Sequence, residues 1–134
     1  MQLIGGKPVY SATDLVGYLA CERLTALDQA AMLRLLPNPR RYDAELEVLR
    51  KRGFDHEWRF RDHLVSQGKR VIEIPTAPWD ETYAERLWEA ANATEQAMAE
   101  GWDVIYQGTF FDGRWRGHPD FLLRVDDADR PTRF

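Results

Sequence analysis

The residues best suited to metal chemistry lie at 117–125, where the sequence reads GHPDFLLRV. Asp120 opens an otherwise apolar strand, so its carboxylate is expected at the end of a sheet, where the residues that follow it anchor it in the core. His118 comes two positions earlier, and the period of two in a strand would place both side chains on one face. The alternative is that Asp120 is a turn residue that hydrogen-bonds its own backbone.

A second candidate site is the segment GFDHEWRF at 53–60. His56 and Glu57 are adjacent, so on a helix their side chains point about 100° apart and do not bind one metal ion as a pair. One of the two could face a neighbouring strand. The alternative is a solvated helix face on which Arg59 and Arg61 balance the acidic residues.

Basic and aromatic residues gather in the sequence near 102–116. A surface formed by Arg114, Trp115 and Arg116, with Trp102 and Tyr106, could contact the DNA backbone and stack on unpaired bases. Alternation along a strand would place Arg114 and Arg116 on one face and Trp115 on the other. The alternative is therefore a strand with one polar and one buried face.

The elements that must position these residues begin with two predicted helices. Ser11 and Asp14 have the spacing of a capping box, and the apolar residues after them predict one helix over 12–36. The sequence Pro37-Asn38-Pro39 ends that helix. A second helix is predicted over 43–67, where Gly53 favours a break or kink. The residues of the first helix expected in the core are Leu15, Leu19 and Leu27.

The second half of the chain predicts strands around one more helix. Gly68 ends the second helix, and residues 71–74 form a short β-branched strand that Pro75 and Pro78 end. Asp80 is the predicted N-cap of a helix over 81–100, which Gly101 ends. Residues 104–109 alternate as a strand, Asp112-Gly113 predicts a hairpin turn, and two strand pieces follow over 114–125. The chain is therefore predicted to be α/β, with N-terminal helices and a small mixed sheet that includes a β-hairpin.

Composition limits the classes of protein to which the chain can belong. Its 134 residues are 44% hydrophobic and 30% charged, which is typical of one globular domain over residues 1–134. The net charge of −4 argues against a surface that binds nucleic acid everywhere, but it leaves open a local basic groove. Cys21 is the single cysteine, so no intrachain disulfide is possible. The sequence shows neither a secretory signal nor a long apolar run, so we expect a cytoplasmic protein without a membrane partner.

Several runs of residues carry a resemblance to a known family. They are YSATDL at 10–15, LTALD at 24–28, GFDHE at 53–57, and DVIYQGTFFDGRWRG at 103–117, which continues into HPDFL at 118–122. With these runs the chain resembles the RecB-like nucleases, a branch of the PD-(D/E)XK nuclease superfamily, over nearly its whole length. The long run at 103–117 is the most specific of them.

The resemblance implies a fold and an activity. The fold would be an incomplete PD-(D/E)XK restriction-endonuclease-like core, and the activity would be metal-dependent hydrolysis of DNA phosphodiesters. His56 would be the catalytic metal ligand from a helix, with Glu57 as the alternative, and Asp120 would be the catalytic ligand from a strand. The cofactor would be Mg²⁺ or Mn²⁺, which suits hard oxygen ligands and imidazole. The implied partners are DNA and a helicase domain or helicase partner.

One part of the family pattern is missing, namely the strand that supplies an acid and a lysine with the spacing D/E-x-K. The three lysines are Lys7, Lys51 and Lys69, and none has Asp or Glu two positions before it, so the chain contains no D/E-x-K. Only fourteen residues follow Asp120, from 121 to 134. We therefore expect the N-terminal part of a nuclease domain, truncated after Phe134 and inactive alone.

Cys21 has a counterpart in similar nucleases that bind a 4Fe–4S cluster, where three further cysteines follow the catalytic core. One thiolate cannot hold such a cluster, so we expect one only if more cysteines lie beyond Phe134. The alternative is a buried cysteine that packs in the core. Two other functions stay open: a non-catalytic module with the same partial fold that binds nucleic acid or a helicase, and an unrelated α/β domain in which Asp120 caps a turn.

Overall fold

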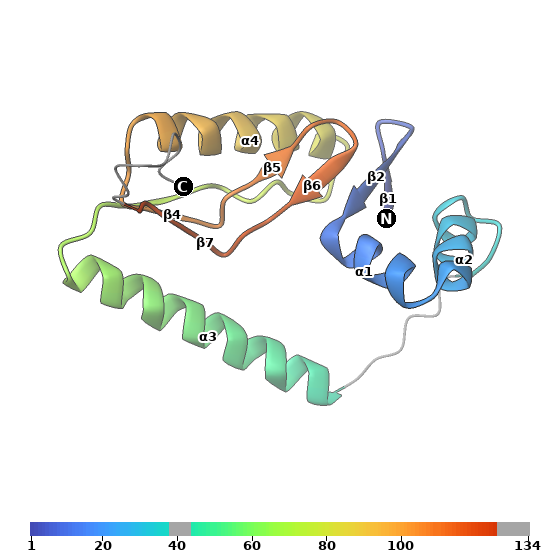
Figure 1. Cartoon of the computed structure of the whole chain (residues 1–134), viewed down its shortest axis with the longest axis horizontal. Coiled ribbons are helices and arrows are strands. Elements are labelled where there is room, and N and C mark those ends of the chain that lie inside the picture. The colour runs from blue at the N-terminus through green and yellow to red at the C-terminus, as the bar shows by residue number, and fades with distance from the viewer. Residues whose placement is uncertain (38–43, 126–134) are drawn as a thin grey trace.

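The computed structural model of the chain describes residues 1–37 and 44–125, and these form a mixed α/β structure (Figure 1). The α/β prediction is confirmed, with N-terminal helices and a hairpin, but the strands form two small sheets and not the single sheet that was predicted. The strands are β1 (Gln2–Ile4), β2 (Lys7–Ser11), β3 (Val71–Glu73), β4 (Val104–Tyr106), β5 (Phe110–Phe111), β6 (Trp115–Gly117) and β7 (Phe121–Leu123). The helices are α1 (Ala12–Ala20), α2 (Glu22–Met32), α3 (Ala44–Ser66) and α4 (Tyr83–Ala99).

The first sheet has the strand order β3-β4-β7. β4 pairs parallel with β3 and antiparallel with β7, so the sheet is mixed, as predicted. α4 connects the two parallel strands, which makes β3-α4-β4 a crossover unit. α4 lies on one side of this sheet and α3 on the other, so side chains of α3 can meet the strand ends (Figure 1).

The second sheet has the order β1-β2-β6-β5, and two of its strands, β1 and β2, were not predicted. β1 and β2 form a hairpin through Gly5 and Gly6, whose φ angles of 55° and 75° suit glycine. β5 and β6 form the predicted hairpin around Asp112-Gly113, where Gly113 has φ 89°. β6 then pairs parallel with β2 and joins the two hairpins.

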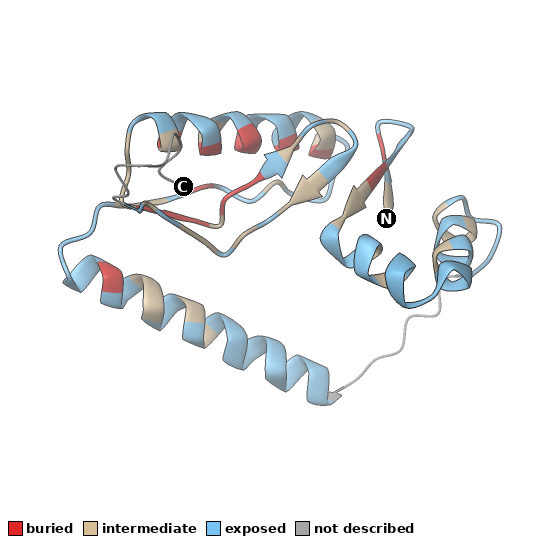
Figure 2. Cartoon of the chain, in the orientation of Figure 1, coloured by how far each residue is buried: buried red, intermediate tan, exposed pale blue. Residues whose placement is uncertain are grey.

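The core lies between α4 and the two sheets (Figure 2). One face of α4 is buried at a helical period, and Leu87 on that face has no exposed surface. Leu87 packs in a cluster with Tyr83 on the same helix and with Ile4 and Val9, which lie on β1 and β2. A second cluster contains Ile74, Ala90, Ala97 and Ile105. α4 therefore supports both sheets.

The predicted single helix over 12–36 is wrong, because the chain breaks into α1 and α2 at Cys21. Cys21 is extended, with φ −163° and ψ 107°, and its amide donates to the carbonyl of Gly17 at 2.9 Å. The start was predicted correctly, since Asp14 Oδ2 accepts hydrogen bonds from Ser11 N at 2.7 Å and Ser11 Oγ at 2.8 Å.

The expectation that the apolar residues of this region lie in the core is also wrong. Leu15, Leu19 and Leu27 are 48%, 76% and 46% exposed. The physical reason is that α1 packs against α2 and β2 at the edge of the molecule, and neither helix has a buried residue.

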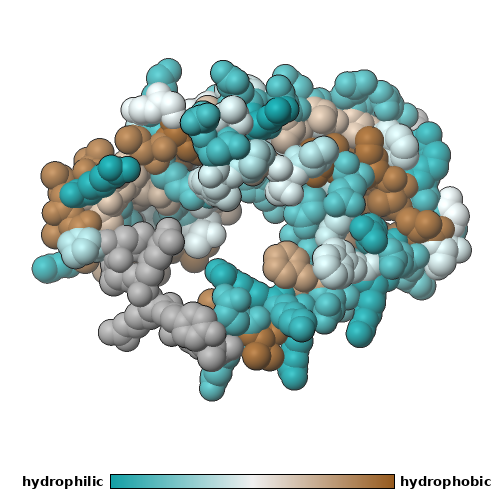
Figure 3. Space-filling model, turned by 180° about the vertical axis from the view of Figure 1, so that it is seen from behind, coloured by the Kyte–Doolittle hydropathy of each residue, from teal (hydrophilic) through white to brown (hydrophobic). Residues whose placement is uncertain are grey.

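Seen from the opposite side, hydrophobic side chains lie at both ends of the visible face, and the molecule has an opening near its middle (Figure 3).

The bounds of α3 and α4 agree closely with the helices predicted over 43–67 and 81–100. α3 continues through Gly53 without a break, and Gly68, with φ 80°, ends the helix with its amide 2.9 Å from the carbonyl oxygen of Val65. α4 begins two residues later than predicted. Its N-cap is Thr82, because Asp80 instead accepts hydrogen bonds from Thr82 N at 2.8 Å and Thr82 Oγ1 at 2.6 Å. The predictions made for 38–43 and 126–134 lie outside the described residues.

Candidate functional site

The C-terminal half of α3 presents one face to the first sheet. Glu57, Phe60, Arg61 and Leu64 have the spacing i, i+3, i+4, i+7, and they are the side of the helix that is at least half covered. The Phe60 ring meets the Phe121 ring edge-on at 5.0 Å between centroids. This contact joins α3 to β7.

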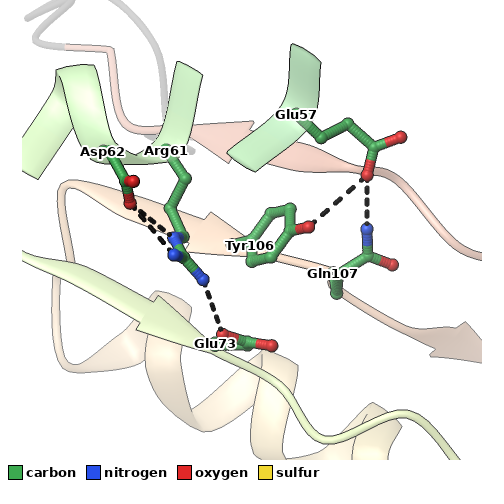
Figure 4. Close-up of polar contacts among 6 residues, drawn as sticks. All are labelled: Glu57, Arg61, Asp62, Glu73, Tyr106 and Gln107. Atoms are coloured by element: carbon green, nitrogen blue, oxygen red, sulfur yellow. Dashed lines mark hydrogen bonds and ion pairs between the residues drawn. The ribbon is translucent and has the colours of Figure 1, made fainter. Parts of the chain in front are cut away.

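Glu57 reaches the end of β4 (Figure 4). Its Oε2 accepts a hydrogen bond from Gln107 Nε2 at 3.0 Å and a longer one from the Tyr106 hydroxyl at 3.5 Å. Hydrogen bonds to an ionised carboxylate are stronger than bonds between neutral groups. The carboxylate of Glu57 is therefore held at the sheet by Tyr106, the last residue of β4, and by Gln107, which follows it.

Gln107 is a site residue that the sequence analysis missed. It directly follows β4 and has φ 56°, which is the left-handed region. Its backbone amide donates to the carbonyl oxygen of Asp120 at 2.9 Å, while its side chain holds Glu57. The signal was a polar residue placed just after the apolar run VIY and just before Gly108. Gln107 thus connects the two candidate acids, one on α3 and one before β7.

Asp120 lies immediately before β7, at the end of the sheet, and its side chain is exposed. The expectation that His118 and Asp120 share a strand face is wrong, because both residues lie in the connection between β6 and β7, where the period of two does not hold. His118 Nδ1 is 3.3 Å from Thr109 Oγ1. Partial burial lowers the pKa of His118, and the positive charge of Arg116 lowers it further.

His56 and Cys21 both lie away from this acid pair. The side chain of His56 is on the exposed face of α3, so the structure brings Glu57, and not His56, to the sheet. Cys21 is an exposed free cysteine at the α1-α2 break, so the alternative of a buried packing cysteine is wrong. Among the described residues, no group of three or more His, Cys, Asp or Glu side chains is arranged to hold a metal ion.

Arg61 lies one helical turn after Glu57 and is paired with acids (Figure 4). Its guanidinium is 3.0 Å from Asp62 and 3.4 Å from Glu73 on β3, and its Cζ lies 5.7 Å from the centre of the Tyr106 ring. The hydrogen bonds with Asp62 raise the pKa of Arg61, and the negative charges of Asp62 and Glu73 add to this. Arg61 therefore serves to hold α3 on the sheet.

The predicted basic and aromatic surface is divided among separate places. Trp115 is exposed and its ring lies 5.4 Å from the Tyr10 ring, so it is not on a buried face. Arg116 is half-buried and donates to the Tyr83 hydroxyl at 2.8 Å. Tyr106 is buried in the core, and the Trp102 ring instead contacts Arg70. Arg114 and Trp115 remain together at an accessible surface.

Comparisons with protein-family models, with curated proteins and with solved structures found no match to this chain. In the described part of the chain, no helix has both the length and the apolar character needed to cross a membrane. The structure itself shows an α/β protein that places two acidic residues, Glu57 and Asp120, at one end of a small mixed sheet.

Proposed function

We propose that this chain is the N-terminal part of a RecB-like nuclease domain with a PD-(D/E)XK-type core, and that it contributes to metal-dependent hydrolysis of DNA. The observation that carries the proposal is the link through Gln107, which joins Glu57 on α3 to Asp120 before β7. An acid from a helix and an acid from a strand then lie at one sheet end, as the resemblance implies. In this proposal Glu57 takes the helix position and His56 does not.

The donor set fits Mg²⁺ or Mn²⁺ in chemistry but is short in number. Glu57 and Asp120 supply carboxylate oxygens, which are the ligands that these hard cations prefer. The described residues bring no third metal-ligating side chain to them. When bound, the metal would polarise a phosphoryl oxygen and lower the pKa of an attacking water. The remaining acid and the lysine of the D/E-x-K pattern would have to come from outside these 134 residues, so the chain alone should cleave DNA weakly or not at all.

Gln107 is the positioning residue in this proposal. It donates to Glu57 Oε2, which fixes the direction of the carboxylate, and its amide fixes the backbone of Asp120. Outer-shell hydrogen bonds of this kind orient metal-ligating carboxylates. Gln107 itself would not touch the metal or the DNA.

Titration of Mn²⁺ into the chain, followed by calorimetry, tests the proposal without a need for activity. We expect weak binding that Glu57→Gln and Asp120→Asn each reduce about tenfold or more, because each removes one charged ligand. His56→Gln is the matched control, since it changes the adjacent exposed residue, and it should bind Mn²⁺ as the wild type does. Equal affinity in all four proteins would contradict the assignment of Glu57 and Asp120.

A non-catalytic module that binds nucleic acid or a helicase is the second candidate. It is favoured by the incomplete donor set and by the accessible position of Arg114 and Trp115. This module would bind DNA equally well in EDTA and in Mn²⁺, and it would show no metal binding that depends on Asp120. Comparing DNA affinity in the two buffers separates the two functions.

A further inference from the structure

A pocket of about 360 Å³ lies between β2, the two N-terminal helices and β6, apart from the acid pair. Its lining includes Tyr10, Leu15, Tyr18, Thr25, Arg114 and Trp115. Three of these side chains are aromatic and one is a cation. A concave and mostly apolar site with a few polar groups is the usual form of a site for a small ligand or for one group of a larger ligand.

The pocket is built by the parallel pairing of β2 with β6. This pairing sets Tyr10 opposite Trp115, and their rings lie 5.4 Å apart at an interplanar angle of 43°. α1 begins directly after β2, so Leu15 and Tyr18, three positions apart, line the pocket beside the two rings. Trp115 is 41% exposed and Tyr18 is 46% exposed, which leaves both rings accessible to a ligand.

The hairpin turn fixes Arg114, its last residue, and Trp115, the first residue of β6. Asp112 Oδ1 accepts hydrogen bonds from Arg114 N at 2.8 Å and from Trp115 N at 2.6 Å. The carbonyl oxygen of Arg114 accepts a hydrogen bond from Tyr10 N at 2.8 Å. The backbone of Arg114 and Trp115 is therefore held in place before any ligand binds, which lowers the entropy cost of binding.

The charges at the pocket favour an anionic ligand. Asp14 also lines it, but its carboxylate is paired with the amino group of Met1 and accepts hydrogen bonds from Ser11. The negative charge of Asp14 is thus compensated, while Arg114 contributes an exposed guanidinium that also interacts with the charge of Asp112 in the turn. Aromatic rings beside a cation are the combination that binds single-stranded nucleic acid, because bases stack on the rings and phosphate meets the cation.

We propose that this pocket binds one unpaired base of single-stranded nucleic acid, with the base against Trp115 and Tyr18 and the adjoining phosphate at Arg114. The choice of nucleic acid as ligand rests on the proposed function. The pocket adds to that function a preference for single-stranded nucleic acid. Base stacking on aromatic side chains tolerates any base, because every base has a π-face. The pocket would then hold a strand without reading its sequence.

The test measures fluorescence anisotropy of a labelled oligothymidine mixed with the 134-residue chain in EDTA, with an abasic strand of equal length as the second probe. We expect the oligothymidine to bind about tenfold or more tightly than the abasic strand, since both carry the same phosphates and only one has bases. Trp115→Leu should remove this preference. Trp58→Leu is the matched control, because Trp58 is similarly exposed, at 53%, and lines no part of the pocket.

Tyr18→Leu keeps the test decisive if Trp115→Leu does not fold, because the Tyr18 hydroxyl makes a long and exposed contact of 3.5 Å with Glu22, whose loss should cost little stability. Equal affinity for the oligothymidine and the abasic strand would overturn the proposal, and so would a Trp115→Leu loss no larger than that of Trp58→Leu. Thymidine monophosphate that competes as well as the strand would also overturn it, in favour of a free nucleotide. Since no metal is present, failure of this test can be distinguished from failure of the Mn²⁺ titration that tests the nuclease proposal.

Discussion

Gln107 Nε2 lies 3.0 Å from Glu57 Oε2, although the two residues are 50 positions apart in the sequence. The bond joins the middle of α3 to the end of β4, and it depends on an unusual backbone. Gln107 has φ 56°, and this left-handed conformation turns the chain out of the strand. A side chain that serves a site at the cost of backbone strain suggests that its role is more than packing.

Two substitutions separate the hydrogen bond of Gln107 from its backbone conformation. Gln107→Ala should destabilise the protein by about 1 kcal/mol, because the partly buried carboxylate of Glu57 loses a donor. Gln107→Gly loses the same donor but fits the positive φ, so it should be about 1 kcal/mol more stable than Gln107→Ala. Urea unfolding measures both. A Gln107→Gly protein less stable than the alanine variant would contradict the role assigned to the backbone.

Leu87 and Leu19 test which leucines form the core. Leu87 has no exposed surface, whereas Leu19 is 76% exposed. Leu87→Ala should cost about 2–5 kcal/mol, because it removes buried methyl groups and leaves a cavity. Leu19→Ala should change the free energy of unfolding by no more than about 0.5 kcal/mol. A large loss in Leu19→Ala would show that α1 is covered in solution.

Thr94 is a buried polar residue that joins α4 to the segment between β4 and β5. Its Oγ1 accepts a hydrogen bond from Thr109 N at 2.9 Å and donates to the carbonyl oxygen of Ala90 at 2.8 Å. Thr94→Val keeps the shape but leaves the buried Thr109 amide without its acceptor, which should cost about 1–3 kcal/mol. Amide hydrogen exchange should show the Thr109 amide losing protection. Thr76→Val, at an exposed position, is the control, and a similar cost in both variants would refute the assignment.

Asp103 should make stability depend on acid pH. Its Oδ2 accepts a hydrogen bond from Arg70 N at 2.8 Å, and this bond lowers the pKa of Asp103 below its usual range, with the charges of Arg124 and Arg70 also lowering it. Because the pKa is lower in the folded state, the contribution is present above the unfolded pKa and is lost as the pH falls through the folded one.

The measurement is the urea midpoint of wild type and Asp103→Asn between pH 7 and pH 3. Asp103→Asn should be less stable than wild type at pH 7, and the difference should begin to shrink below about pH 4, where the carboxyl of the unfolded chain becomes protonated, and should shrink further as the pH falls toward the lower pKa of the folded state. Other acids titrate in the same range, so the difference between the two proteins is the quantity to follow. A difference that stays constant with pH would exclude an electrostatic role for Asp103.

Local patterns in the sequence were enough to predict most of the individual elements. Gly68 ends α3 and Asp112-Gly113 turns the hairpin, because positive φ angles select glycine at both positions. The sequence also predicted Asp120 at the start of a strand, because it directly precedes the apolar run at 121–123. These features depend on neighbours within a few residues, so no knowledge of the tertiary structure was needed.

The tertiary structure alone decided which side chains meet. The face of α3 that packs on the sheet selects Glu57 over His56, and periodicity cannot show which of two adjacent residues a distant sheet will cover. The parallel pairing of β2 with β6 brings Tyr10 to Trp115 across more than a hundred residues, and the sequence gives no local sign of it. Such long-range contacts depend on how whole elements share buried surface, and that balance is set only when the chain is folded.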